Sequence, residues 1–166
     1  MSACAKCSAK LIEEVIAGLP VHLAQINIAR MRAALNDPIM KGFADQLVDV
    51  NRSAESSPGF IWRLKTEEGD ATNIRAYEDE LILVNMSVWE SIESLREFTY
   101  RSHHAAVFRD RQQWFERMNE TQLALWWIPT GHTPTVEEGK SRLALIEKLG
   151  PTPEAFTFKK IFDPTK

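Results

Sequence analysis

The residues best suited to chemistry lie in one stretch, Ser87–Phe115, where two adjacent histidines stand among aromatic and arginine side chains. A neutral imidazole can act as a base near pH 7 or ligate a haem iron. On a helix over 103–118, steps of four and three place His104 on one stripe with Phe108, Arg111, Phe115 and Met118. His104 is therefore the favoured catalytic candidate, and His103 and Phe108 are candidates for substrate contact. The alternative is a histidine buried in the core or at a subunit interface.

Three arginines accompany the histidines, at positions 101, 109 and 111. A guanidinium group matches planar anions such as a carboxylate, a phenolate or a haem propionate. We take Arg111 as a candidate for substrate binding. The alternative is a solvated helix face on which these arginines pair with Glu97, Asp110 and Glu116.

The tryptophans form a second set of candidates, since the chain contains five of them. Trp126 and Trp127 are adjacent, so on a strand they must point to opposite faces. Trp62 and Trp126 are candidates for lining a pocket that accepts a flat aromatic ligand. Core packing is the alternative for each of them.

The elements that position these residues follow from hydrophobic periodicity and breaker residues. Strands are predicted at Val21–Ile28, Phe60–Lys65, Leu81–Trp89 and Leu123–Pro129, with a last extended piece at Phe156–Phe162. Helical segments are predicted at Met31–Ser53 with an interruption at Pro38, from Ser91 onward, and at Thr135–Leu149. Ser91 and Thr135 are the predicted N-caps.

The resulting order, β-α-β-β-α-β with a further helix and strand, predicts an α+β fold with a ferredoxin-like antiparallel sheet. Residues 1–19 are expected to be a flexible segment with a short helix, and 20–166 a single domain. Apolar side chains occupy both faces of the strands, so one face needs a cover. Two copies that pack sheet against sheet into a dimeric α+β barrel would provide it.

Composition excludes several classes of protein. The net charge of −3 argues against a nucleic-acid-binding protein, and no apolar run is long enough to span a membrane. A cytoplasmic protein is the expectation. Cys4 and Cys7 form a C-x-x-C without a preceding strand or a second pair, which favours a flexible segment over a thiol or zinc site. Phosphate-binding glycine loops and the common hydrolase motifs are absent from the sequence.

Two long blocks carry a family resemblance: WWIPTGHTPTV at Trp126–Val136 and GPTPEAFTF at Gly150–Phe158. Together with the stretch Val88–Phe115, these blocks resemble a bacterial family of domains of unknown function in the dimeric α+β barrel superfamily. The resemblance covers roughly residues 20–163. It implies the fold, and its wider relatives include cofactor-free antibiotic-biosynthesis monooxygenases and haem-degrading enzymes. Fold alone does not choose among these reactions.

The resemblance also implies roles for individual residues. Asn27 on the first strand, His104 on the helix, and an aromatic residue, Phe98 or Trp89, match the working residues of such relatives in part, because the relatives' helix tryptophan is replaced by Phe98. We therefore expect a monooxygenase-like enzyme acting on a hydrophobic, aromatic or polyketide-like substrate, with Asn27 and Trp89 positioning the substrate or O₂. No cofactor is predicted. One alternative is a haem protein with His104 as axial ligand; another is a non-catalytic, ligand-binding or structural dimer.

The remaining histidines are assigned structural places. His132 lies in a predicted turn before a helix, where a turn-stabilising or capping role is favoured. His22 and Asn27 are separated by five positions, which places them on opposite faces of a regular strand. The two are not expected to act together.

Overall fold

Strand β1 (Val21–Arg30) lies inside the sheet, between β3 (Ile82–Trp89) and β4 (Leu123–Pro129). Strand β2 (Phe60–Arg63) pairs with the other edge of β3, so the order is β2-β3-β1-β4. Every neighbouring pair is antiparallel. The computed structural model describes residues 20–101 and 109–164.

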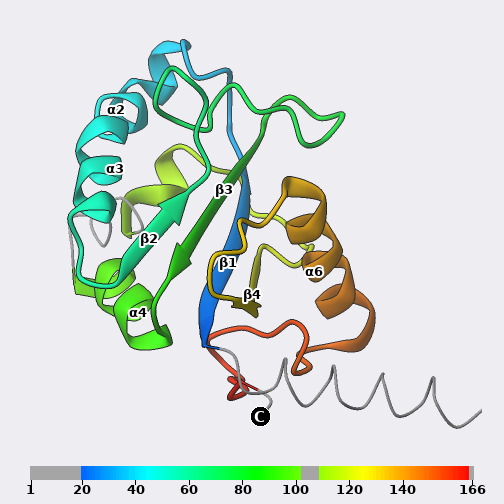
Figure 1. Ribbon diagram of the computed structural model, residues 1–166. Coiled ribbons are helices and arrows are strands. Elements are labelled where there is room, and N and C mark those ends of the chain that lie inside the picture. Colours follow the sequence, from blue (N-terminus) through cyan, green and yellow to red (C-terminus); the bar gives the residue numbers. More distant parts are fainter. Residues whose placement is uncertain (1–19, 102–108, 165–166) are drawn as a thin grey trace, which may run out of the picture.

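Helices cover both sides of this sheet (Figure 1). On one side lie α2 (Lys41–Ala44), α3 (Leu47–Glu55) and α4 (Ile92–Arg101), and on the other lies α6 (Val136–Leu149). Two single 3-10 turns, η1 (Pro38–Met40) and η2 (Arg111–Gln113), complete the described helical elements. The fold is thus mixed α+β with a four-stranded antiparallel sheet, as the predicted class required. Among the described helices, none is long and apolar enough to cross a membrane.

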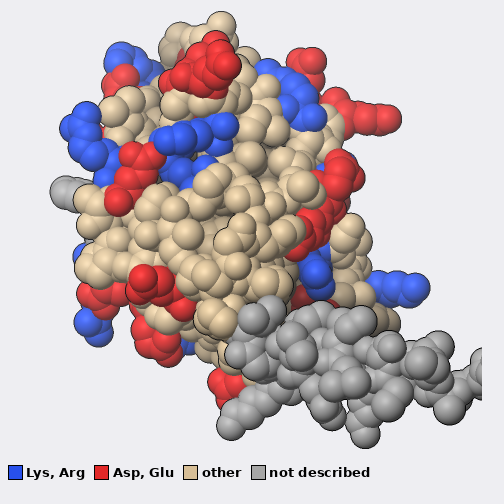
Figure 2. Space-filling model, viewed as in Figure 1, with Lys and Arg blue, Asp and Glu red and all other residues tan. Residues whose placement is uncertain are grey.

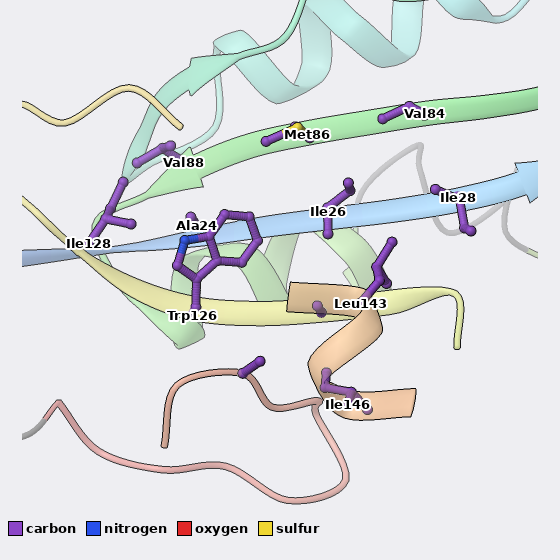
Figure 3. Close-up of a cluster of buried hydrophobic side chains, with 12 residues drawn as sticks. Ala24, Ile26, Ile28, Val84, Met86, Val88, Trp126, Ile128, Leu143 and Ile146 are labelled. Atoms are coloured by element: carbon purple, nitrogen blue, oxygen red, sulfur yellow. The ribbon is translucent and has the colours of Figure 1, made fainter. Parts of the chain in front are cut away.

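Alternation along the strands separates the core into clusters on the two faces. The face toward α6, which we call the α6 face, carries Ala24, Ile26 and Ile28 of β1. Figure 3 shows these side chains beside those of the neighbouring elements: Val84, Met86 and Val88 of β3, Trp126 and Ile128 of β4, and Leu143 and Ile146 of α6. The opposite face, the α4 face, carries Leu23, Trp89 and Leu125 against Ile92 and Leu95 of α4. A third cluster joins Met31, Met40, Phe43 and Trp114 on the same side as α4, with Leu83 packed against it.

The predicted helix caps are confirmed. The backbone N–H of Ser94 donates to Ser91 Oγ at 3.1 Å at the start of α4. Thr135 caps α6, because its Oγ1 accepts the backbone N–H of Glu138 at 3.1 Å. Each hydroxyl satisfies a donor that the first helical turn leaves free.

The predicted helix Met31–Ser53 is wrong at its beginning. Residues 32–37 form turns and bends, and helical structure begins only at Pro38, in short pieces. Asp37 causes this late start, since its Oδ1 accepts the backbone N–H of Ile39 at 3.0 Å and caps the 3-10 turn. Ile39 lies 51% exposed at this turn.

Two further predictions of regular structure are wrong. The stretch Phe156–Phe162 is not a strand, because it holds only single bridges, Phe156 to Leu125 and Thr157 to Lys160 around a turn at 158–159. Of the predicted helix over 103–118, residues 103–108 lie outside the described residues. The described part does not stay helical through Phe115, which forms a bridge with Met31. Phe115 packs with Phe43, at 5.0 Å between ring centroids, so tertiary contacts replace the helical stripe.

Gly139 of α6 marks the closest approach of this helix to the sheet. A Cβ at this position would lie 2.6 Å from Ile26 Cδ1 and 3.3 Å from Met86 Cε. Ile26 is 0% exposed, so its methyl group cannot move into solvent. The approach depends on the missing side chain of Gly139.

Substitution Gly139→Ala should therefore destabilise the fold, although alanine is the better helix former. Overpacking costs roughly 1–3 kcal/mol, which exceeds the gain of about 1 kcal/mol in helix propensity. Urea unfolding measures the difference, with Ser141→Ala on the exposed side of α6 as the control. An unchanged or higher midpoint for Gly139→Ala would show that α6 does not need this close approach.

Candidate functional site

The α4 face carries a row of uncharged polar side chains in the middle of the sheet. We call this set the amide strip: Gln25 and Asn27 on β1, and Asn85 and Ser87 on β3. The strands place them side by side, because Gln25 is the pairing partner of Ser87 and Asn27 that of Asn85. Inner strands packed on both faces normally carry apolar residues at such positions. The strip is therefore the feature of the sheet that packing does not explain.

The strip extends from the core to solvent. Gln25 is only 6% exposed and Ser87 7%. Asn27 is half-buried and Asn85 is exposed, although β3 is an inner strand. Along β3, Leu83 packs in the cluster around Met40 and Trp89 packs under α4, so Asn85 lies between two covered regions. The sheet thus opens to solvent at Asn85.

Hydrogen bonds join the strip to one of the predicted residues, Trp89. Gln25 Nε2 donates to Asn85 Oδ1 and to Ser87 Oγ, both at 3.0 Å. Trp89 Nε1 donates to the same Ser87 Oγ at 2.8 Å. Trp89 is 0% exposed and lies between Phe60 and Phe98, whose ring centroids are 5.4 and 5.2 Å away. It can hold Ser87 in place, and its ring does not reach solvent.

A surface cleft of about 370 Å³ lies next to this aromatic stack, between the α3–β2 turn and α4. Phe98 lines it and stacks on Trp89 with an interplanar angle of 24°. The other lining residues are Ser57, Pro58, Glu93, Ser94, Glu97 and Arg101. Arg101 pairs with Glu97 at 3.3 Å, as the helix-face alternative predicted, and both side chains are mostly exposed.

The structure brings only some of the predicted site residues together. Asn27, Trp89 and Phe98 lie on the α4 side of the sheet. Trp62 and Trp126 pack in the cluster on the α6 face, so the sheet separates them from Asn27. Arg111 is exposed and belongs to η2. His103, His104 and Phe108 lie outside the described residues, as do Cys4 and Cys7.

The α6 face carries a different polar group, centred on Glu138. The buried indole of Trp126 donates to Glu138 Oε1 at 2.9 Å, and His132 Nε2 lies 2.8 Å from Glu138 Oε2. Burial raises the pKa of Glu138, and the hydrogen bonds from His132 and Trp126 lower it further than burial raises it, so the net pKa lies below its ordinary value. The contact ties the turn that contains His132 to the first turn of α6.

The haem alternative names His104 as axial ligand, and His104 lies outside the described residues. The described histidines lie elsewhere in the fold. His22 pairs with Ile128, which belongs to the α6 face, and His132 is bound to Glu138. Within the described ranges, no three His, Cys, Asp or Glu side chains are grouped as metal ligands. Neither described histidine lies beside the amide strip, and this alternative rests on His104.

Sequence reasoning found Asn27 and missed Gln25, Asn85 and Ser87. A signal for them exists in the sequence, because polar residues alternate with apolar ones at 25 and 27 and again at 85 and 87. On a solvated sheet such alternation marks the outer face. Here helices pack on both faces, so the same alternation marks polar groups beneath a helical layer.

A family model described as "Domain of unknown function (DUF3291)" matches residues 22–166 of this chain. Among curated proteins, none matches it. One solved structure is similar, the NE2512 protein of unknown function from Nitrosomonas europaea, with 10% identity and a TM-score of 0.44. The similarity covers 71% of this chain and 97% of that chain.

The depressed pKa of Glu138 predicts a pH dependence of stability. A carboxyl group with a lowered pKa in the folded state stabilises the protein above its unfolded pKa, near 4.5, and this contribution is lost as pH falls through the folded pKa. Glu138→Gln should therefore lower the free energy of unfolding by about 1 kcal/mol at pH 7, with the difference shrinking below pH 4.5.

Urea unfolding between pH 7 and pH 3 measures this difference. Glu67→Gln, at an exposed position, serves as the control and should show no such trend. A difference that stays constant over the whole range would mean that the charge of Glu138 contributes nothing.

Proposed function

The chain belongs to the DUF3291 family, and we propose from its own geometry that it is a monooxygenase-like enzyme. In this proposal it holds a hydrophobic, aromatic substrate against the amide strip. The observation that supports this proposal is the exposed Asn85 beside the half-buried Asn27, in the middle of the sheet and between two apolar clusters. Amides in such a place can hold a substrate carbonyl or O₂ by hydrogen bonds. Apolar clusters on either side of them suit an aromatic ring.

In this proposal each residue has a limited task. Asn27 and Asn85 orient the substrate, and Trp89 is a positioning residue, because it reaches the strip through Ser87. The base remains His104, which lies outside the described residues. The reaction is cofactor-free: one atom of O₂ becomes a carbonyl oxygen of the product, and the other leaves as water with the two hydrogens of the oxidised CH₂ group.

The proposed reaction predicts a specific loss in Asn27→Ala. Removing one oriented hydrogen-bonding group should lower protein-dependent O₂ uptake by about 10²-fold. The measurement uses an oxygen electrode with anthrone as the probe substrate, after subtraction of its spontaneous oxidation. Asn119→Ala, at an exposed position of the 116–122 turn, is the matched control and should keep full activity.

Two outcomes would contradict this function. O₂ uptake equal to that of a protein-free sample would leave a non-catalytic binding protein. A protein-dependent Soret band after addition of hemin, lost in His104→Ala, would instead favour the haem alternative.

We further propose that the sheet is the ferredoxin-like sheet of a dimeric α+β barrel. The strand order β2-β3-β1-β4 and the element order support it. On the α6 face, the helix packs over β4 and β1, whereas half-buried side chains such as Trp62, Leu64 and Tyr77 cover the β2–β3 half. Figure 2 shows that the surface over β2 and β3, between α3 and α6, is largely free of charged side chains. A second copy of the chain is the proposed cover.

The proposed dimer predicts sensitivity at Leu64, whose half-buried side chain belongs to the cluster on the α6 face. Leu64→Glu should convert the dimer to a monomer in sedimentation velocity, because an unpaired charge would be buried at the interface. Val48→Glu on α3, where the side chain is 64% exposed, is the control and should leave the dimer intact. A monomeric wild-type chain would contradict this assembly.

A further inference from the structure

Two carboxamides at the centre of the amide strip, those of Gln25 and Asn85, are joined by a single hydrogen bond. Gln25 Nε2 and Asn85 Oδ1 share the bond of 3.0 Å, and Gln25 Nε2 also serves Ser87 Oγ. With Trp89 Nε1 as its second donor, Ser87 Oγ accepts two hydrogen bonds. A hydroxyl oxygen has two lone pairs, so it has no further acceptor capacity. The bonded network therefore fixes which atoms remain available to a ligand.

Within the Gln25–Asn85 pair, the available atoms are one donor and one acceptor. Gln25 Oε1 and Asn85 Nδ2 have no hydrogen-bond partner among the described side chains and backbone groups. In a pair of carboxamides that share one N–H···O bond, the two remaining heteroatoms are always one NH₂ or N–H donor and one carbonyl acceptor. This holds even if both amide groups are turned over together. The donor–acceptor pair is thus a property of the Gln25–Asn85 contact itself.

Both available atoms are accessible from the open side. Asn85 is exposed. Gln25 is 6% exposed, and its Oε1 is not one of the fully buried polar atoms without a partner in the described part of the chain. A fully buried amide oxygen without a partner would cost about 1–3 kcal/mol, so contact with solvent or a ligand is the stable arrangement.

The surroundings set the charge and shape of the molecule that fits. None of the four strip residues is ionisable, and their neighbours on the same face include Leu23, Leu83 and Leu125. A charged ligand would lose hydration here without gaining an ion pair from the strip residues themselves. A neutral molecule with apolar surface around one polar edge suits the strip better.

We propose that the amide strip recognises a neutral, planar molecule in which an N–H or O–H donor stands directly beside a carbonyl oxygen, as in a lactam or a hydroxyketone. The ligand carbonyl accepts from the free amide nitrogen, and the ligand donor binds the free amide oxygen, so that Gln25 and Asn85 act as one recognition edge. If the proposed function holds, this ligand class is also the substrate class. The binding itself does not depend on any reaction.

Matched probes test this recognition in the full chain by isothermal titration calorimetry. 2-Quinolone carries the lactam edge, 1-methyl-2-quinolone lacks only its donor, and quinoline lacks the carbonyl as well. 2-Quinolone should bind at least about tenfold more tightly than the methylated probe, because the methyl group leaves a protein acceptor unpaired. Asn85→Leu should weaken the binding of 2-quinolone by at least about tenfold, because it removes one of the two groups of the recognition edge, and Asn119→Leu should leave this binding unchanged.

A second measurement does not depend on variants. In ¹⁵N-labelled wild-type protein, the side-chain amide resonances of Gln25 and Asn85 should shift on addition of 2-quinolone and stay in place with quinoline. Equal affinity of the wild-type chain for the two quinolones, binding of 2-quinolone that is unchanged in Asn85→Leu, or no binding of any probe would each overturn the proposal.

The two proposals fail separately. Discrimination between the quinolones without O₂ uptake would keep the ligand class and remove the oxygenase function. O₂ uptake that depends on Asn27, without discrimination, would keep the enzyme and remove the lactam-like recognition edge.

Discussion

The structure depends on the alternation of side chains along β1, the inner strand that is paired on both edges and packed on both faces. Ile26 and its even-numbered neighbours lie under α6, and Leu23 and its odd-numbered neighbours lie toward α4. A shift of one residue in register would exchange the two sets. The separation of the apolar core on one face from the amide strip on the other therefore follows from the pairing of β1 with β3 and β4.

Gln25 shows how polar residues can be tolerated on such a strand. A buried amide without partners costs about 1–3 kcal/mol, and here the side chains of Asn85 and Ser87 on β3 supply them. The same bonds occur only in the observed register, in which Gln25 is opposite Ser87. The strip thus strengthens the choice of register, and its one open edge is what remains for a ligand.

Local signals in the sequence predicted most of the regular elements, because Ser91, Thr135 and the apolar runs of β3 and β4 act over a few residues. The errors arise where distant contacts decide the structure. Phe115 leaves the predicted helix to pair with Met31, and Phe156 bridges to a single residue of β4. For the site, Asn27 is predicted from a resemblance, whereas the position of Asn85 beside Gln25 and Asn27 becomes visible only once β1 and β3 are paired. No local pattern specifies which two polar residues face each other across strands.

The sheet itself decides which predicted residues can belong to one site. Trp62 and Trp126 were expected to line a pocket with Asn27, but they lie on the α6 face and the amide lies on the other. Trp126 is engaged by Glu138, and Trp89 is buried between Phe60 and Phe98. The tryptophans therefore stabilise the two cores on either side of the sheet. The uncharged amides Asn27 and Asn85 lie between those cores and reach solvent on the α4 face, so the proposed ligand site is built on them.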